Sequence, residues 1–169
     1  MAISTEAIRE LRDRTGAGIM DCRRALEQAG GDQGKAMQIL QQQGLERMER
    51  KSGRVARQGV IEAYIHAGGR IGAMVELNCE TDFVARDDGF RQLARELAMQ
   101  VAAHQTTEYV AAEDAPADLS DEEKTQKVLL LQGYIKNERQ SVKDLITERT
   151  ARYGEHVRIG RFARFELGA

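Results

Sequence analysis

The apolar positions of the first 44 residues recur at helical spacing in three short stretches. Ser4 can cap the first helix and Asp32 the third, while Gly30 and Gly31 stop the second and Gly44 ends the third. The apolar stripes predicted for these helices are Ala7, Ile8 and Leu11; Ile19, Cys22, Leu26 and Ala29; and Ala36, Ile39 and Leu40. This pattern predicts a minimal three-helix bundle with a thin core.

Further along, apolar and polar residues alternate on both sides of a Gly-Gly pair, which predicts two paired strands. A two-residue turn would pair Glu62 with Val75 and spoil the apolar face. A three-residue loop at 68–70 instead sets Ile61 opposite Leu77 and gathers the apolar residues on one side. Because register follows the buried face, we expect the longer loop.

The second half of the chain returns to helices before it ends in a strand. A strong apolar stripe runs from Phe90 to Val101, and a capping box at Ser120 opens a helix that is expected to continue through residues 128–131. Another helix follows over residues 142–153. Alternating residues at 157–167 then predict a late strand with Val157, Ile159, Arg161, Ala163, Phe165 and Leu167 on one side.

These elements predict an α+β protein with two parts. Residues 1–44 form the three-helix head, and residues 45–58 form a basic linker that begins as a charged helix. Residues 59–169 form an α+β core, in which a small antiparallel sheet is covered by helices.

Composition adds little electrostatic bias. Residues 1–57 carry 11 Lys and Arg against 8 Asp and Glu, so this part holds +3 and the rest −5 of the net charge of −2. The molecule as a whole is therefore not drawn strongly to nucleic acid or membrane. The sequence lacks an apolar run long enough to span a bilayer, and its start lacks the pattern of a secretory signal, so we expect a cytoplasmic protein. Cys22 and Cys79 are expected to be thiols.

Candidate catalytic groups are sparse, so we do not expect an enzyme. The three histidines lie far apart in the sequence and lack metal-ligand spacing, and we expect no metal site and no cofactor. Cys79 follows a strand as a nucleophile could, but no paired base accompanies it. The linker residues Arg47, Arg50, Lys51, Arg54 and Arg57 leave open an alternative function, a small RNA-associated helical protein.

Two apolar residues resist a purely structural interpretation. Met20 lies off the apolar stripe of its helix, among charged neighbours, where a pliable side chain could contact a partner. Phe83 lies between an apolar strand and the long helix. It either folds under the chain as a plug or projects as an anchor, and the pattern slightly favours the plug. Asp82 beside it could cap the next turn.

Several separated stretches of the chain, which together span nearly its whole length, resemble one family, translation elongation factor Ts in its short bacterial or organellar forms. They are Thr15-Gly16-Ala17-Gly18-Ile19-Met20-Asp21-Cys22-Arg23-Arg24-Ala25-Leu26, Gly31-Asp32, Asn78-Cys79-Glu80-Thr81-Asp82-Phe83-Val84-Ala85-Arg86, Gln132-Gly133-Tyr134-Ile135-Lys136, Val142-Lys143-Asp144-Leu145, and the ending Gly154-Glu155-His156-Val157 with Arg161-Phe162-Ala163-Arg164-Phe165-Glu166-Leu167-Gly168.

The resemblance implies a head like the ubiquitin-associated fold and a function in guanine nucleotide exchange. Members of this family bind elongation factor Tu and promote release of its GDP. By resemblance, Ile19 and Met20 touch the partner from the head, and the segment Thr81, Asp82, Phe83 and Val84 intrudes beside its Mg²⁺ site. The resemblance also implies a possible homodimer or two-to-two complex, no nucleotide of the chain's own and no stable nucleic-acid binding.

The sequence departs from the family pattern in its later part. The region between Tyr109 and Gln132 is short, Gly133 stands where proline is common, and Asn137 replaces a usual aspartate. These departures bear on the outer contacts of the core and on any dimer, and they leave the two contact motifs intact.

Overall fold

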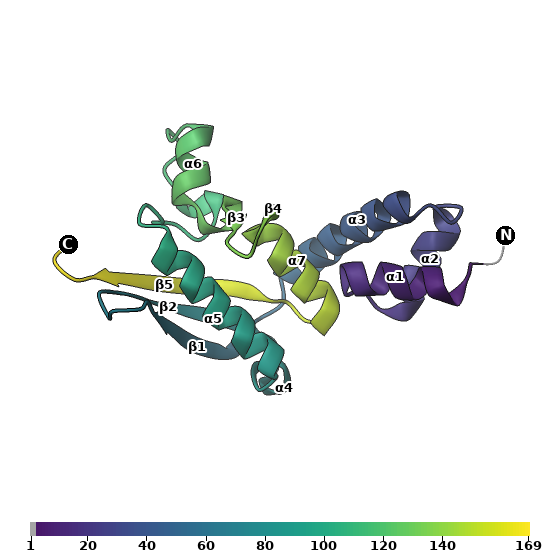
Figure 1. Ribbon diagram of the computed structural model, residues 1–169, viewed down its shortest axis with the longest axis horizontal. Coiled ribbons are helices and arrows are strands. Elements are labelled where there is room, and N and C mark those ends of the chain that lie inside the picture. The colour runs from purple at the N-terminus through teal and green to yellow at the C-terminus, as the bar shows by residue number, and fades with distance from the viewer. Residues whose placement is uncertain (1–2) are drawn as a thin grey trace. The chain divides into compact units, whose positions relative to one another are not determined.

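The computed structural model describes residues 3–169, apart from the side chains of residue 45 and residues 47–52. The chain divides into two compact units (Figure 1). The helical unit is Met1–Arg54 with Thr147–Glu155, and the sheet unit is Val55–Ile146 with His156–Ala169. Each unit is described below by itself.

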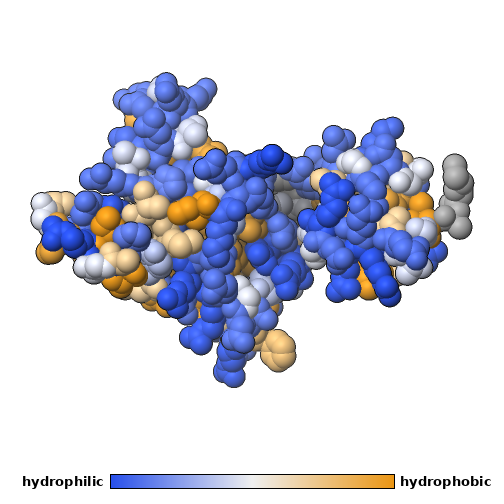
Figure 2. Space-filling view, viewed as in Figure 1, coloured by the Kyte–Doolittle hydropathy of each residue, from blue (hydrophilic) through white to orange (hydrophobic). Residues whose placement is uncertain are grey.

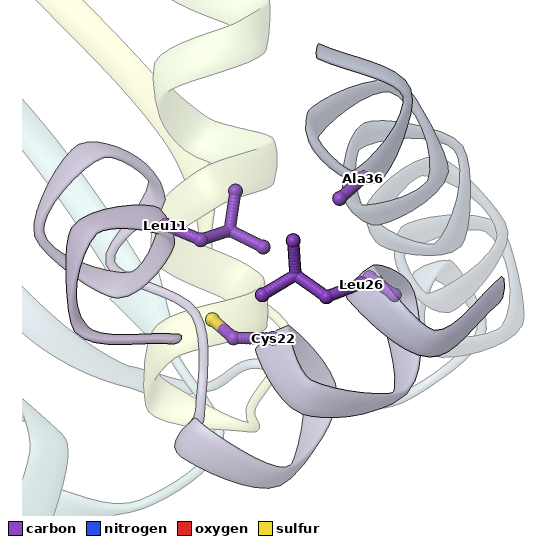
Figure 3. Packing of buried hydrophobic residues seen from close by; sticks show 5 residues of the cluster. Leu11, Cys22, Leu26 and Ala36 are labelled. Atoms are coloured by element: carbon purple, nitrogen blue, oxygen red, sulfur yellow. The ribbon is translucent and has the colours of Figure 1, made fainter. Parts of the chain in front are cut away.

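The helical unit contains the three predicted helices, α1 (Thr5–Thr15), α2 (Ile19–Gln28) and α3 (Gln33–Ser52). Both predicted caps are present: Ser4 Oγ accepts from the Ala7 N–H at 3.1 Å, and Asp32 Oδ1 accepts from the Lys35 N–H at 2.9 Å. The core is small, as Figure 3 shows, and its fully buried members are Leu11, Cys22, Ala25, Leu26 and Ala36.

The prediction that Gly44 ends the third helix is wrong, because α3 continues to Ser52. A Cβ added at Gly44 would lie 3.3 Å from Cγ2 of Thr147, which belongs to α7 (Val142–Tyr153). This glycine therefore permits close packing of two helices rather than a helix end. In a sequence the two uses look the same. The limits of the head and of the linker at 45–58 stay a prediction.

The sheet unit is built on three antiparallel strands, β1 (Gln58–Ile65), β2 (Ile71–Cys79) and β5 (Arg158–Glu166), with β2 in the centre. The long helix α5 (Asp88–Ala103) lies across one face of this sheet (Figure 1). It buries the predicted stripe of Phe90, Leu93, Ala94, Leu97, Ala98 and Val101. The α+β class is thereby confirmed.

The predicted hairpin register, with a loop at 68–70 and Ile61 opposite Leu77, is wrong. The structure pairs Ile61 with Glu76 and Glu62 with Val75, the register that the buried-face argument rejected. That argument assumed one apolar face, whereas both faces of this hairpin carry apolar residues. Glu62 is tolerated on the helix-covered side because Arg91 of α5 lies 3.4 Å from its carboxylate.

The other face of the sheet is left uncovered within this unit, and we call it the open sheet face. It combines exposed apolar side chains with one ion pair, Arg161 to Glu76 at 2.8 Å. Figure 2 views the molecule from the α5 side and shows hydrophobic surface also where α5 leaves the strand ends uncovered. The residues of the open sheet face are Ile61, Ala63, Ile65, Met74, Glu76, Arg161, Ala163 and Phe165.

The alternation predicted for the last strand is broken by a register shift between Glu76 and Leu77 of its neighbour β2. Ile159 is buried before the shift, whereas Phe165 is 65% exposed after it. A Cβ added at Gly160, opposite the shift, would lie 2.5 Å from Oδ1 of Asn78. The glycine thus marks a bulge, which exchanges the two faces of the strand.

The remaining elements follow α5 along the chain. The capping box at Ser120 is confirmed, but the helix it opens, α6 (Asp121–Lys127), stops before residues 128–131, which turn into a separate 3₁₀ segment. The others are η1 (Ala112–Asp114), η2 (Leu129–Leu131), β3 (Gly133–Tyr134) and β4 (Asn137–Ser141). The β3–β4 pair was not predicted, since β3 has only two residues and the residues of β4 are all polar, which leaves no alternation to detect. Among the described residues, no helix is both long and apolar enough to cross a membrane.

Candidate functional site

The motif at residues 81–84 lies at the end of the central strand, in a single turn of helix, α4 (Asp82–Ala85). Thr81 has extended backbone angles and caps the turn, because its Oγ1 accepts from the Val84 N–H at 3.5 Å. Val84 and Ala85 are buried and fix the turn to the sheet unit. We call residues 81–86 the α4 turn.

Phe83 projects from the α4 turn and is 87% exposed. The sequence pattern slightly favoured a Phe83 that folds under the chain as a plug. For the chain by itself this interpretation is wrong. The two residues after Phe83 take the inward-facing positions of the turn, which leaves the aromatic ring on the outside. A phenyl ring held in water on a buried support is typical of a contact residue.

Asp82 does not cap a helix as suggested. Thr81 caps α4, and Asp87 caps α5 by accepting from the Phe90 N–H at 3.0 Å. Asp82 instead forms an ion pair with Arg86 at 3.0 Å, with both side chains well exposed. Such a pair is weak and can open at little cost when another partner is offered.

The second predicted contact lies at the start of α2. Met20 is 60% exposed, in agreement with its place off the apolar stripe. The assignment of Ile19 to that buried stripe is wrong, because its side chain is 53% exposed. Ile19 is the first residue of the helix, after an extended Gly18 that has no side chain to cover it. The two apolar side chains are adjacent and together offer a small hydrophobic contact.

The cysteines have surroundings that do not favour nucleophilic chemistry. Burial raises the pKa of the Cys22 thiol and outweighs the hydrogen bond between Cys22 and Thr15, which lowers it. The thiolate is thus disfavoured at neutral pH. Cys79 is fully buried, and its thiol donates to the backbone oxygen of Thr81 at 3.1 Å. Within the described part of the chain, no three His, Cys, Asp or Glu side chains form a group able to hold a metal ion.

The basic linker can be described only in part. Arg54 and Arg57 are exposed. The side chains of Arg47, Arg50 and Lys51, on which the RNA-binding alternative mainly depends, lie outside the described residues.

One tie to the α4 turn was missed by sequence reasoning. The backbone N–H of His156 donates to Oε1 of Glu80 at 2.6 Å. Glu80 directly precedes the α4 turn, but its partner lies 76 residues further along the chain, and no local pattern links the two.

Exposed apolar side chains on small, rigid supports are typical of a protein that acts by contact with another protein. Comparison with known sequences agrees. The family model described as Elongation factor TS matches residues 33–127. The chain is 47% identical to Elongation factor Ts of Carboxydothermus hydrogenoformans over 98% of its own length and 89% of the relative's.

Two further relatives named Elongation factor Ts agree. The one from Coprothermobacter proteolyticus is 43% identical over 99% of this chain and 100% of the relative's length. The one from Thermotoga maritima is 44% identical over 99% of this chain and 98% of the relative's length. The chain belongs to the translation elongation factor Ts family. The role of this family is guanine nucleotide exchange on elongation factor Tu during translation elongation. The alignment with Coprothermobacter spans 197 positions against 169 residues, so the relative carries segments that this chain lacks.

Proposed function

We propose that this protein binds elongation factor Tu in the cytoplasm and speeds release of GDP by bringing Phe83 and Asp82 beside the partner's Mg²⁺ site. The observation that carries the proposal is the 87% exposure of Phe83 on a turn whose next two residues are buried. A rigid aromatic ring has little rotamer freedom to lose on docking and can act as a wedge.

The chemistry of Mg²⁺ explains why such a wedge would release GDP. Mg²⁺ neutralises the diphosphate and requires near-ideal octahedral geometry, so disturbing its ligands weakens the phosphate contacts. Asp82 can leave its exposed ion pair with Arg86 to accept a hydrogen bond from the partner. No covalent bond is made or broken, and the chain needs no nucleotide or cofactor of its own.

Linkage gives this proposal a direct test. A factor that prefers the nucleotide-free partner must lose affinity when GDP is bound. In size-exclusion chromatography with light scattering, the protein and nucleotide-free elongation factor Tu should elute as a complex, and excess GDP with Mg²⁺ should dissociate it. A complex of unchanged stability in excess GDP would contradict the exchange function, although not binding as such.

Ile19 and Met20 are proposed to form a second contact from the helical unit. Met20→Asp should weaken binding to elongation factor Tu by roughly tenfold, because a charge would be buried against an apolar patch. Isothermal titration with the nucleotide-free partner measures this change. Val55→Asp is the matched control, since Val55 is 64% exposed and lies outside both contacts. Equal affinities for the two variants would remove Met20 from the interface.

The open sheet face supports the proposal of a homodimer, and hence of a two-to-two complex with the partner. Its apolar residues could pack against a second copy about a two-fold axis. The ion pair of Glu76 and Arg161 balances the charge at the centre of this face. The pKa of Glu76 is lowered mainly by a hydrogen bond from Asn78 and next by one from Arg161, so this carboxylate stays ionised opposite a cation. Two copies would therefore meet no excess of like charge.

Light scattering tests this pairing without the partner. At micromolar concentration the chain should have a mass of about twice 18.9 kDa. Phe165→Glu should return it to the monomer, because one carboxylate would then be buried in the apolar face. Val55→Glu should leave the dimer intact. A parent chain that stays monomeric at all concentrations tested would contradict the dimer and leave the exchange function standing.

A further inference from the structure

The junction between β2 and the α4 turn is held by a backbone group that comes 76 residues later in the chain. Oε1 of Glu80 accepts from the backbone N–H of His156 at 2.6 Å. Glu80 is half-buried, and His156 is 8% exposed. A hydrogen bond to a carboxylate is stronger than one between neutral groups. The chain just before β5 is thus tied to the residue that precedes Thr81.

Neighbouring residues add to this restraint. The Cys79 thiol donates to the backbone oxygen of Thr81 at 3.1 Å, and Thr81 in turn caps α4. Three successive residues at the end of the strand therefore have contacts that set the direction in which the chain leaves the sheet. Phe83 follows two residues later, so this direction decides where its ring points.

The α4 turn needs such external ties because its own hydrogen bonds are few. Its helix has four residues, with backbone bonds from Ala85 to Thr81 at 3.3 Å and from Arg86 to Asp82 at 3.1 Å. One helical turn by itself is unstable in water, since nucleation fixes several dihedral angles for very few hydrogen bonds. Burial of Val84 and Ala85 fixes one side of the turn. The point at which the chain enters the turn is fixed by the hydrogen bond of Glu80 to His156.

We infer that Glu80 is a positioning residue, which acts on the partner through Phe83 rather than by contact of its own. This inference rests on the proposed exchange function. With the carboxylate in place, the ring is held in one orientation before docking. Without it, the turn takes several orientations, and docking must first select one, which lowers the affinity for the partner.

A double-mutant cycle tests the inference through the rate of labelled GDP release from elongation factor Tu at limiting concentrations of the protein. Glu80→Ala should lower the acceleration by roughly tenfold, the effect of losing one strong hydrogen bond. Glu80→Gln should retain most of it, since its amide oxygen still accepts. In a Phe83→Ala background, Glu80→Ala should have almost no further effect. Glu108→Ala, which removes an exposed carboxylate paired with Lys127, is the matched control.

Hydrogen–deuterium exchange supplies a readout that does not depend on activity. Amides of residues 82–87 should exchange faster in Glu80→Ala than in the parent, with β2 unchanged. If Glu80→Ala does not fold, Glu80→Asp replaces it, because the shorter side chain cannot reach the same N–H.

These experiments distinguish a failure of the positioning role of Glu80 from a failure of the proposed role of Phe83. Unchanged amide protection, parental activity in Glu80→Ala, or additive losses in the Phe83→Ala background would each overturn the positioning role and leave the exchange function standing. Parental activity in Phe83→Ala would overturn the wedge, and the role of Glu80 with it.

Discussion

Phe83→Ala is expected to reduce the acceleration of GDP release by about 30-fold or more, the range of an interface hot spot. The ring is 87% exposed, so it contributes little to the fold. Its removal should change the free energy of unfolding by less than about 0.5 kcal/mol, as for other surface substitutions. Stopped-flow release of labelled GDP at limiting concentrations of the protein measures the first effect, and thermal unfolding measures the second.

The control for this variant is Val55→Ala, which truncates another well-exposed apolar side chain of the sheet unit. It should keep the parental rate. If Phe83→Ala and Val55→Ala both match the parent, the ring is not the wedge. If Phe83→Ala loses activity together with stability, the ring contributes to the fold in a way that its exposure does not suggest.

Phe90→Ala should instead lower stability and leave the activity of the folded protein unchanged, although Phe90 and Phe83 are only seven positions apart. Phe90 is fully buried in the first turn of α5, where that helix packs on the sheet. Its truncation should lower the free energy of unfolding by about 3–5 kcal/mol, because it removes apolar burial and leaves a cavity. The specific activity of the fraction that remains folded should stay near that of the parent.

Hydrogen exchange of β2 in increasing urea measures this loss, since the central strand reports on the sheet unit separately from the helical unit. A two-unit chain need not unfold in one step, which makes a local probe preferable to a global one. A loss below about 1 kcal/mol would mean that the neighbouring side chains collapse into the space, contrary to the expected cavity.

Local signals in the sequence predicted the fold well where a structure depends on near neighbours. The caps at Ser4 and Ser120 and the stripe of α5 are formed by residues three or four positions apart. The errors arose where distant residues decide. Gly44 looked like a helix end because Thr147, whose packing explains the glycine, lies 103 positions further along the chain. The predicted hairpin register was wrong because the open sheet face also carries apolar residues, among them Ile61, Ile65 and Met74.

In the candidate site too, some features could be predicted from neighbouring residues and others depended on the folded structure. The motif at 81–84 could be found from the sequence, yet the pattern left Phe83 between plug and anchor. Its orientation depends on which residues of one short turn are buried, and no periodicity can be read from four residues. Val84 and Ala85 settle it in the structure. The tie from Glu80 to His156 could not be predicted for a different reason, since it joins parts of the chain that are adjacent only after folding.

The most direct test of the central claim is the rate at which labelled GDP leaves elongation factor Tu in excess unlabelled GDP and Mg²⁺, measured against the concentration of this protein. The exchange function predicts that the rate rises with concentration and then saturates. Chelation of Mg²⁺ should speed spontaneous release and shrink the acceleration, because the wedge acts through the Mg²⁺ site. A release rate that stays at the spontaneous value, even with the protein in stoichiometric excess, would contradict the claim.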